Sequence, residues 1–137
     1  LTIGCYNTAE ILQYTGNGTL LLRLPVQSAT GYAMFAVPLS NQQFLYSDRS
    51  YLNLVSSSGQ CTQLRTLRAC YDIAVTSLGY YLVPDQMLNN VALFSPGLNY
   101  VHDLVSGKPA IFIALDEKAG RMFIADWTTI TVFSLNN

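Results

Sequence analysis

The feature that most constrains this chain is a repeat of about 40 residues. Equivalent positions in short apolar segments are occupied by Tyr14, Val55, Phe94 and Phe133, which are spaced 41, 39 and 39 residues apart. A period in this range predicts an array in which each unit is one supersecondary element that buries its apolar surface against the next unit. The repeat therefore predicts the architecture of the protein, but it does not indicate a function.

Each repeat contains up to four apolar segments, rich in Val, Ile, Leu, Tyr, Phe and Thr, which predict β-strands. The first segment carries an alanine next to an aliphatic residue, and the second ends at an aspartate or asparagine. Turn residues follow the third segment, at Gly16-Asn17-Gly18, Ser57-Ser58-Gly59 and Ser95-Pro96-Gly97. Each complete repeat is thus predicted to be a four-stranded antiparallel meander, with strands that we call A to D.

The chain is out of phase with its own repeats. It begins at strand B of the first unit and ends after strand C of the last, which predicts 14 strands distributed as BCD, ABCD, ABCD and ABC. We expect an all-β, β-propeller-like array of four-stranded antiparallel blades with incomplete first and last blades. The expected single domain spans residues 1–137, with blades at about 1–25, 32–67, 70–106 and 109–137.

The last repeat carries a recognisable pattern: Ile113-Ala114-Leu115-Asp116, then Ala119-Gly120, then Ile124-Ala125-Asp126-Trp127 and Ile130-Thr131-Val132-Phe133. This pattern resembles an NHL-type repeat and is similar to the related YWTD repeat of lipoprotein-receptor propellers. The resemblance is good over 109–135, recognisable over 32–106 and partial over 1–25. Pro38 and Thr76 replace the first aspartate of the pattern, and Asn7 replaces the second. The resemblance implies a propeller fold and says little about function.

Composition excludes several classes of protein. Half of the 137 residues are hydrophobic and 11% are charged, so disorder is not expected. A net charge of -1 without clustered Lys or Arg argues against nucleic-acid binding. No apolar run approaches the roughly 18 residues of a membrane-spanning helix. Because the chain starts at Leu1, we expect either that a leader has been removed or that this is a piece of a longer protein.

Cysteines and a glycosylation motif bear on the compartment. Cys61 and Cys70 flank eight residues, which suits a local disulfide between neighbouring strands and leaves Cys5 free or paired with another chain; the alternative is three buried thiols. Asn17-Gly18-Thr19 is an N-glycosylation sequon in an expected turn. Together with the low charge, these features favour a secreted, extracellular glycoprotein.

Four residues recur at one repeat position: Asn7, Asp48, Asp85 and Asp126. Carboxylates converging at one end of a ring would suit calcium or another ligand. Alternatively, each side chain caps the turn that follows it by accepting backbone N–H bonds. We favour the structural interpretation, because the resemblance implies that this aspartate is part of the repeat itself.

No catalytic or metal-binding arrangement stands out in the sequence. His102 is the only histidine and falls on an expected outer strand, where it has no partners for a zinc site or a catalytic triad. Glu117 follows Asp116 in an expected turn, and gluconolactonase-like propellers hold a metal with Glu, Asn and Asp. We nevertheless expect no cofactor, no metal and no catalytic residue.

Aromatic side chains are a further candidate for contact with a ligand. Trp127 and several tyrosines could form a binding face for carbohydrate or protein, although packing between blades also needs large rings. Arrays of this kind must also cover the strand edges at their two ends.

We therefore expect a non-enzymatic, extracellular propeller module for assembly or protein binding, completed by strand pairing with a second copy or another chain. A lectin-like propeller and a fragment of a gluconolactonase- or strictosidine-synthase-like enzyme are the alternatives. The array could be a small closed ring, half of a larger ring, or a segment of a longer protein.

Overall fold

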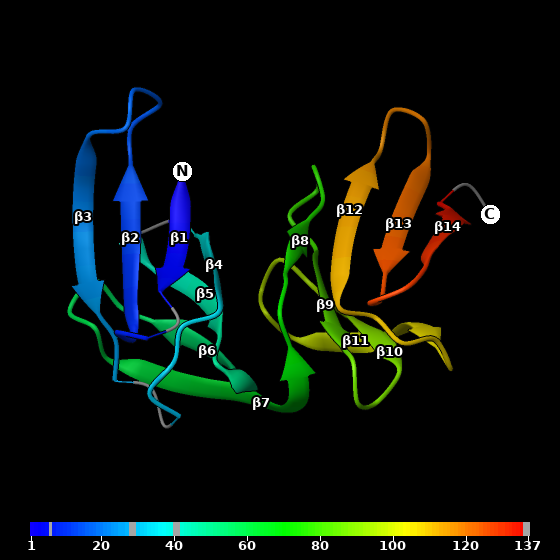
Figure 1. The fold of residues 1–137 in the computed structure, drawn as a ribbon, viewed down its shortest axis with the longest axis horizontal. Helices are drawn as coiled ribbons and strands as arrows, with labels where there is room; N and C mark the ends of the chain where they lie inside the picture. The colour runs from blue at the N-terminus through cyan, green and yellow to red at the C-terminus, as the bar shows by residue number, and fades with distance from the viewer. Residues whose placement is uncertain (6, 28–29, 40–41, 136–137) are drawn as a thin grey trace. The chain divides into compact units, whose positions relative to one another are not determined.

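A computed structural model describes residues 1–5, 7–27, 30–39 and 42–135 and shows a protein built from β-strands (Figure 1). The strands are β1 (Thr2–Cys5), β2 (Glu10–Tyr14), β3 (Leu20–Pro25), β4 (Phe35–Pro38), β5 (Phe44–Ser47), β6 (Arg49–Val55), β7 (Cys61–Cys70), β8 (Ala74–Val75), β9 (Tyr81–Asp85), β10 (Asn90–Phe94), β11 (Tyr100–Ser106), β12 (Phe112–Asp116), β13 (Arg121–Ala125) and β14 (Ile130–Ser134). Within the described ranges, no helix is long and apolar enough to cross a membrane.

The strands form four antiparallel sheets in sequence order. Their strand orders are β1-β2-β3, β4-β5-β6-β7, β11-β10-β9-β8 and β12-β13-β14. The first sheet therefore holds strands B to D of a repeat, the next two hold A to D, and the last holds A to C. This arrangement confirms the predicted all-β fold with incomplete first and last blades.

The turns between strands C and D repeat in detail. In each turn a backbone N–H donates to a carbonyl oxygen four residues later, at 2.9 Å in all three cases: Thr15 to Thr19, Ser56 to Gln60, and Ser95 to Asn99. Gly59 in the second turn has a φ of +84°, and a Cβ there would collide with the carbonyl oxygen of Pro25. Glycine is therefore required at this position by both conformation and space.

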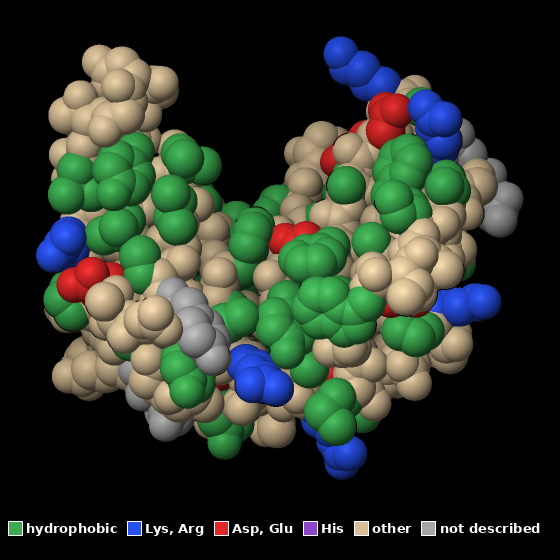
Figure 2. Space-filling model, viewed as in Figure 1, with side chains coloured by type: hydrophobic (Ala, Val, Ile, Leu, Met, Phe, Trp, Pro, Cys, Tyr) green, Lys and Arg blue, Asp and Glu red, His purple; other side chains and the backbone are tan. Residues whose placement is uncertain are grey.

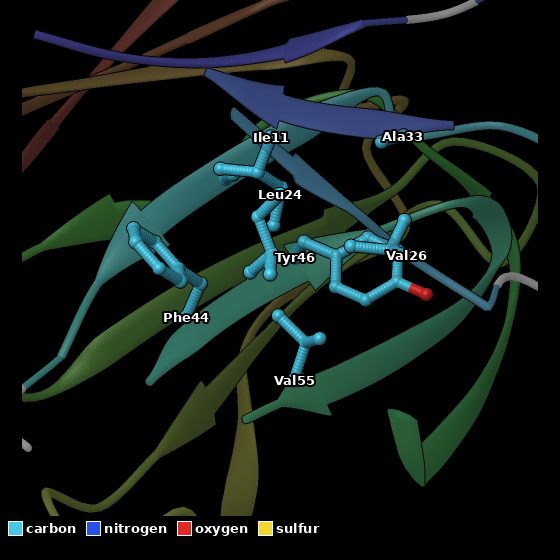
Figure 3. Close-up of a cluster of buried hydrophobic side chains, with 8 residues drawn as sticks. Ile11, Leu24, Val26, Ala33, Phe44, Tyr46 and Val55 are labelled. Carbon is cyan, nitrogen blue, oxygen red and sulfur yellow. The ribbon is translucent and has the colours of Figure 1, made fainter. Parts of the chain in front are cut away.

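The chain divides into two compact units, Leu1–Leu67 and Arg68–Asn137. The first unit contains the sheets β1–β3 and β4–β7, and its core lies between them (Figure 3). Ile11 of β2 and Leu24 of β3 pack with Phe44, Tyr46 and Val55 of the second sheet. One face of each sheet is therefore buried by its neighbour, as in stacked propeller blades.

The second unit repeats this arrangement with the sheets β8–β11 and β12–β14. Leu82, Val91 and Val105 of the first of these sheets pack with Met122 and Ile124 of the other, among other residues. The inner strands β5 and β9 are buried along their whole length. This burial explains why their sequences are almost continuously apolar.

Candidate functional site

The three recurring aspartates lie at or directly after the ends of β5, β9 and β13 and accept backbone hydrogen bonds. Asp48 accepts from the N–H groups of Ser50 (3.1 Å) and Tyr51 (2.8 Å). Asp126 accepts from the N–H groups of Thr128 (2.7 Å) and Thr129 (2.8 Å) and from both threonine hydroxyls. Each of these two carboxylates thus caps its own hairpin turn.

Asp85 holds two segments together. Its carboxylate accepts from the N–H groups of Arg68 (2.8 Å) and Ala69 (3.2 Å) near the end of β7, and from Leu88 (3.3 Å) in its own turn. Asp85 is almost fully buried, so these bonds satisfy side-chain oxygens that are shielded from water. Asn7, the fourth member of the series, lies exposed in the turn between β1 and β2.

Electrostatics distinguish two aspartates of the second unit. The N–H groups of Thr128 and Thr129, assisted by the threonine hydroxyls, lower the pKa of Asp126 to about 2. Burial raises the pKa of Asp72, which precedes β8, although its carboxylate accepts from the N–H groups of Ile113 and Ile73, both at 2.9 Å. Hydrogen bonding dominates at Asp126 and desolvation dominates at Asp72.

Two carboxylates link the two sheets of the second unit. Asp72 reaches the N–H of Ile113 in β12. Glu117 accepts from the N–H of Ser77 (2.7 Å) and from its hydroxyl. Sequence reasoning considered Glu117 only as a metal ligand and did not identify Asp72, because neither link leaves a local pattern. Among the described residues, no group of three or more His, Cys, Asp or Glu side chains could hold a metal ion.

The expected disulfide between Cys61 and Cys70 is wrong for this fold. The two cysteines are the first and last residues of the single strand β7, which places them roughly 30 Å apart at the usual rise per residue. A disulfide needs Cα atoms within about 7 Å. No disulfide joins Cys5, Cys61 and Cys70 in this structure. The Cys61 thiol lies 3.2 Å from the Tyr46 hydroxyl, and the Cys70 thiol donates to the carbonyl oxygen of Asp72.

The other candidate residues lie at the surface. Asn17 is exposed in the turn between β2 and β3, where its side-chain oxygen accepts from the Thr19 N–H (3.3 Å) and hydroxyl (3.0 Å). Glycosylation of Asn17 stays a prediction. His102 is exposed on β11, the outer strand of its sheet.

Trp127 is the centre of an exposed aromatic group. Its side chain is 68% exposed in the turn that Asp126 caps. Its ring lies edge-on to Tyr71 and Phe112, with centroids 6.3 and 6.4 Å away. We call Tyr71, Phe112 and Trp127 the aromatic group. Because the four hydrogen bonds to Asp126 hold the turn, Trp127 is presented on a rigid backbone.

One face of the sheet β12–β14 leaves large apolar side chains exposed. The register of this sheet places Phe112, Ala125 and Ile130 side by side, with Phe123 and Val132 two residues further along the same face. We call these five residues the open face. Ile130 is 70% exposed and Val132 is 54% exposed. The Arg121 guanidinium lies 5.8 Å from the centroid of the Phe123 ring and covers part of it.

Equivalent positions in other sheets are buried. Ile130 corresponds in the repeat to Ile11 of β2 and Val91 of β10, and both are fully buried. Ile11 and Val91 are covered by the next sheet of their own unit. Leu52 of β6 holds the same repeat position and is buried as well. An apolar residue thus occupies this position in all four sheets, and in the last of them it is exposed. Contiguous exposed apolar surface of this kind makes the open face a candidate interaction surface.

The first sheet also has a less covered face. Ile3, Leu12 and Arg23 lie side by side in the register of β1–β3, on the face opposite to Ile11 and Leu24. Ile3 is exposed and Leu12 is half-buried. We call Ile3 and Leu12 the first-sheet face.

Hollows on the second unit are largely apolar. A cavity of about 270 Å³ on the open face is lined by Phe112, Phe123 and Ile130, among others. Two further cavities, of about 290 and 210 Å³, share Leu104 and Leu135 beside β14. Figure 2 shows hydrophobic side chains at the visible surface of this unit, beside several charged side chains.

Comparison with known proteins identifies the fold. No family model and no curated protein matches the sequence. A chain of the nidogen/laminin complex is similar in structure, with a TM-score of 0.69 and 15% identity, covering 98% of this chain and 57% of that one. The WD40 domain of Neurospora crassa Pan2 gives a TM-score of 0.63 at 13% identity, covering 96% and 44% of the two chains.

Enzymes also occur among the similar structures. Virginiamycin B lyase from Staphylococcus aureus gives a TM-score of 0.61 at 11% identity, covering 96% of this chain and 50% of that one. The chain thus spans about half the length of the solved structures that it matches. At such low identities the likeness shows the fold alone. This chain has a β-propeller fold, in the form of four successive blades of which the first and last are three-stranded.

Proposed function

We propose that this chain is a non-enzymatic, extracellular propeller module of the NHL or YWTD type that serves in assembly, with a second copy of the chain as its partner. The observation that carries this proposal is the open face. Ile130 is 70% exposed at a repeat position where Ile11 and Val91 are fully buried. Leaving such a surface in water is unfavourable, because each apolar Å² that is buried contributes about 25 cal/mol.

A second copy fits the open face because the repeat makes the two surfaces complementary. Inside each unit, the face that carries Ile11 or Val91 packs on the opposite face of the following sheet. The first-sheet face is the surface of β1–β3 that corresponds to that opposite face. An open face of one copy can therefore pack on the first-sheet face of another copy. The contact is heterologous, and it gives a ring if the rotation closes and a fibre if it does not.

Light scattering over a wide concentration range tests the assembly. We expect masses that are multiples of 15.1 kDa. The double variant Ile130→Lys, Val132→Lys should give a 15.1 kDa monomer, because it places charges on the open face. His102→Lys is the matched control, since it adds a charge at an exposed strand position outside the open face. A monomer of the unsubstituted chain at every concentration contradicts the proposal.

Mixing variants tests the heterologous geometry. Ile3→Lys, Leu12→Lys should block the first-sheet face, so that this variant is also a monomer. An equimolar mixture with the open-face variant should restore a dimer, because each copy then contributes one intact surface. If the first-sheet variant assembles normally by itself, the open face pairs with a different surface.

The extracellular location rests on the exposed sequon at Asn17 together with the low charge of the chain. Secretion from a eukaryotic host should give a product that becomes lighter on enzymatic deglycosylation. Asn17→Gln should give the lighter form directly. An unmodified secreted chain would remove this support.

The aromatic group favours carbohydrate binding as a second candidate function. An exposed tryptophan on a rigid turn offers a flat apolar surface for a sugar ring. Trp127→Ala should abolish binding on a glycan array while leaving the light-scattering mass unchanged. An array without a signal would leave assembly as the better proposal. Retention of a metal, lost in Glu117→Ala, would instead favour the enzyme alternative.

A further inference from the structure

A cavity with a polar lining lies between the two sheets of the first unit. It measures about 450 Å³ and is lined by side chains that include Gln13, Leu22, Gln42, Gln43, Phe44 and Ser57. Small-molecule sites in proteins commonly enclose about 300–1,000 Å³. None of the described lining residues is charged, so the cavity combines the volume of a ligand site with an uncharged, hydrogen-bonding surface.

Gln13 departs from the repeat at this cavity. The corresponding residues of the other sheets are Leu54, Leu93 and Val132, so an apolar side chain is the rule at this position. Gln13 follows Ile11 by two residues on β2, and both side chains therefore lie on the face that packs on the second sheet. A glutamine thus stands where the core between the two sheets meets the cavity.

Gln42 is a second departure, and it lines the same cavity. The turn between β4 and β5 is closed by the Leu39 N–H, which donates to the Gln43 carbonyl oxygen (2.8 Å), and the turn between β8 and β9 is closed in the same way (2.9 Å). The residue before the acceptor has a positive φ in both turns: +80° at Gly79 and +58° at Gln42. A side chain makes this conformation unfavourable. Residues that keep such a conformation are concentrated at functional sites, including ligand-binding sites.

Three side-chain amides in the cavity are available to a ligand. In the described part of the chain, the amide groups of Gln13, Gln42 and Gln43 make no hydrogen bond to another residue. Gln13 and Gln43 are half-buried, so they are also partly shielded from water. Each amide offers two N–H donors and one carbonyl acceptor, and Ser57 adds a hydroxyl. These groups can satisfy a ligand that both donates and accepts hydrogen bonds.

A cavity between the two sheets of the second unit shows that the fold does not require this polarity. It measures about 290 Å³ and contains Leu93, the repeat equivalent of Gln13, together with Leu82, Leu104 and Leu115. Two neighbouring blades therefore pack with leucine at this position. Packing alone does not account for a glutamine there, and departures from a local rule of this kind are expected where a protein has a function.

We propose that the cavity of the first unit binds a neutral saccharide of one or two rings, with Gln13, Gln42 and Gln43 as its hydrogen-bonding side chains. Sugar hydroxyls donate and accept, as amides do, and the C–H groups of a sugar ring can pack on the apolar floor that Phe44 forms (Figure 3). A charged ligand would lack a charged partner among the described lining residues, and an apolar ligand would leave the amides unpaired. The site needs neither the open face nor assembly, and it is distinct from the aromatic group of the second unit.

NMR titration of the isotope-labelled full chain tests the site, with glucose, galactose, maltose and lactose as probes. We expect at least one probe to bind with a Kd of about 1 mM or below and to shift the side-chain amide signals of the three cavity glutamines saturably. The signal of Gln63, an exposed glutamine on β7, should not move. Glucuronate and galacturonate should bind about tenfold more weakly than glucose and galactose, because they carry a charge. Binding this weak dissociates during the washing of a glycan array, so it is measured in solution.

Two variants restore the residues of the other repeats and should therefore fold. Gln13→Leu and Gln42→Gly should each weaken the best-binding probe about tenfold or more, because each removes a hydrogen-bonding side chain. Gln42→Gly should also raise the melting temperature, since glycine adopts the positive φ more readily. Gln63→Leu is the matched control for Gln13→Leu and should bind within about twofold of the unsubstituted chain.

Several results would overturn the proposal. These are no binding of any probe up to about 20 mM, shifts that leave the signals of the cavity glutamines unchanged, and normal binding by both Gln13→Leu and Gln42→Gly. Binding that Trp127→Ala abolishes and Gln13→Leu preserves would place the sugar on the aromatic group instead. The double variant Ile130→Lys, Val132→Lys should bind the sugar normally, which separates this site from assembly through the open face.

Discussion

The sheets β8–β11 and β12–β14 share the repeat pattern and differ in their surroundings. Val91 and Ile130 occupy the same repeat position on their third strands, and Val91 is fully buried whereas Ile130 is 70% exposed. The sheet β8–β11 has a fourth strand and a covered third strand, and β12–β14 has neither among the described residues. The repeat therefore specifies strands and turns, whereas burial depends on what is packed against them.

The largest difference in free energy of unfolding is expected between substitutions of apolar residues on the covered face and on the open face. Leu82→Ala should reduce the free energy of unfolding by about 2–5 kcal/mol, because it leaves a cavity between two packed sheets. Ile130→Ala should change it by about 0.5 kcal/mol or less in the monomer, because its side chain already contacts water. Chemical denaturation measures both values, at a concentration where light scattering shows a monomer.

A large loss of stability for Ile130→Ala in the monomer would contradict this expectation and would mean that the open face is covered within a single chain. A loss that appears only at concentrations where the chain assembles would mean that a second copy covers the open face. The free energy would then report coverage by a partner, as mass action requires.

A smaller difference in stability loss is expected between substitutions of two aspartates that share a repeat position. Asp85 is buried and binds the N–H groups of Arg68, Ala69 and Leu88. Asp85→Asn turns an amide N–H₂ toward at least one of these donors, so we expect a loss of about 2 kcal/mol. Asp126→Asn should cost less, because its turn is exposed and water can replace the lost bonds. Thermal unfolding of both variants measures the difference, and equal losses would contradict it.

The smallest expected effect is on the pH dependence of stability, to which Asp126 and Asp72 contribute with opposite signs. The pKa of Asp126 is lowered to about 2, so its contribution to stability is complete above its ordinary pKa near 4 and is lost as the pH falls toward 2. The pKa of Asp72 is raised by burial. Its ionised form is disfavoured in the folded state, so its contribution decreases as the pH rises through its ordinary pKa toward the raised value.

Unfolding experiments between pH 2 and 6 on Asp126→Asn and Asp72→Asn measure these dependences. The stability difference between the unsubstituted chain and Asp126→Asn should grow with pH. The corresponding difference for Asp72→Asn should shrink with pH. Carboxyl NMR titration assigns each change to its residue, and two slopes of the same sign would contradict the opposite pKa shifts of the two carboxyl groups.

Much of the fold could be predicted from the sequence because propeller strands and turns are local features. The 14 strands, their 3-4-4-3 distribution and the turns at Gly18 and Gly59 follow from apolar segments and turn residues that recur along the chain. The Cys61–Cys70 disulfide was predicted wrongly, because the residues between the cysteines continue one strand rather than connecting two. Spacing alone does not distinguish a ten-residue strand from a connection that reverses direction.

The candidate sites were harder to predict. The positions of Asn17 and Trp127 in turns follow from local sequence. The ring contacts of Trp127 do not, because Tyr71 is more than 50 residues away in the sequence and Phe112 lies on another strand. The links from Asp72 to Ile113 and from Glu117 to Ser77 cross between sheets. Such pairings have no periodic signal, because each occurs once in the described chain.

The repeat, the strands, the turns and the distribution of the strands over the four blades could all be predicted from the sequence alone. The tertiary structure decided which of those apolar strands are covered. Local backbone preferences and side-chain patterns are encoded residue by residue, so they can be read along the chain. Burial depends on the neighbour that packs against a sheet. Val91 and Ile130 therefore share a position in the repeat, and only the three-dimensional structure distinguishes a core residue from a surface that is available to a partner.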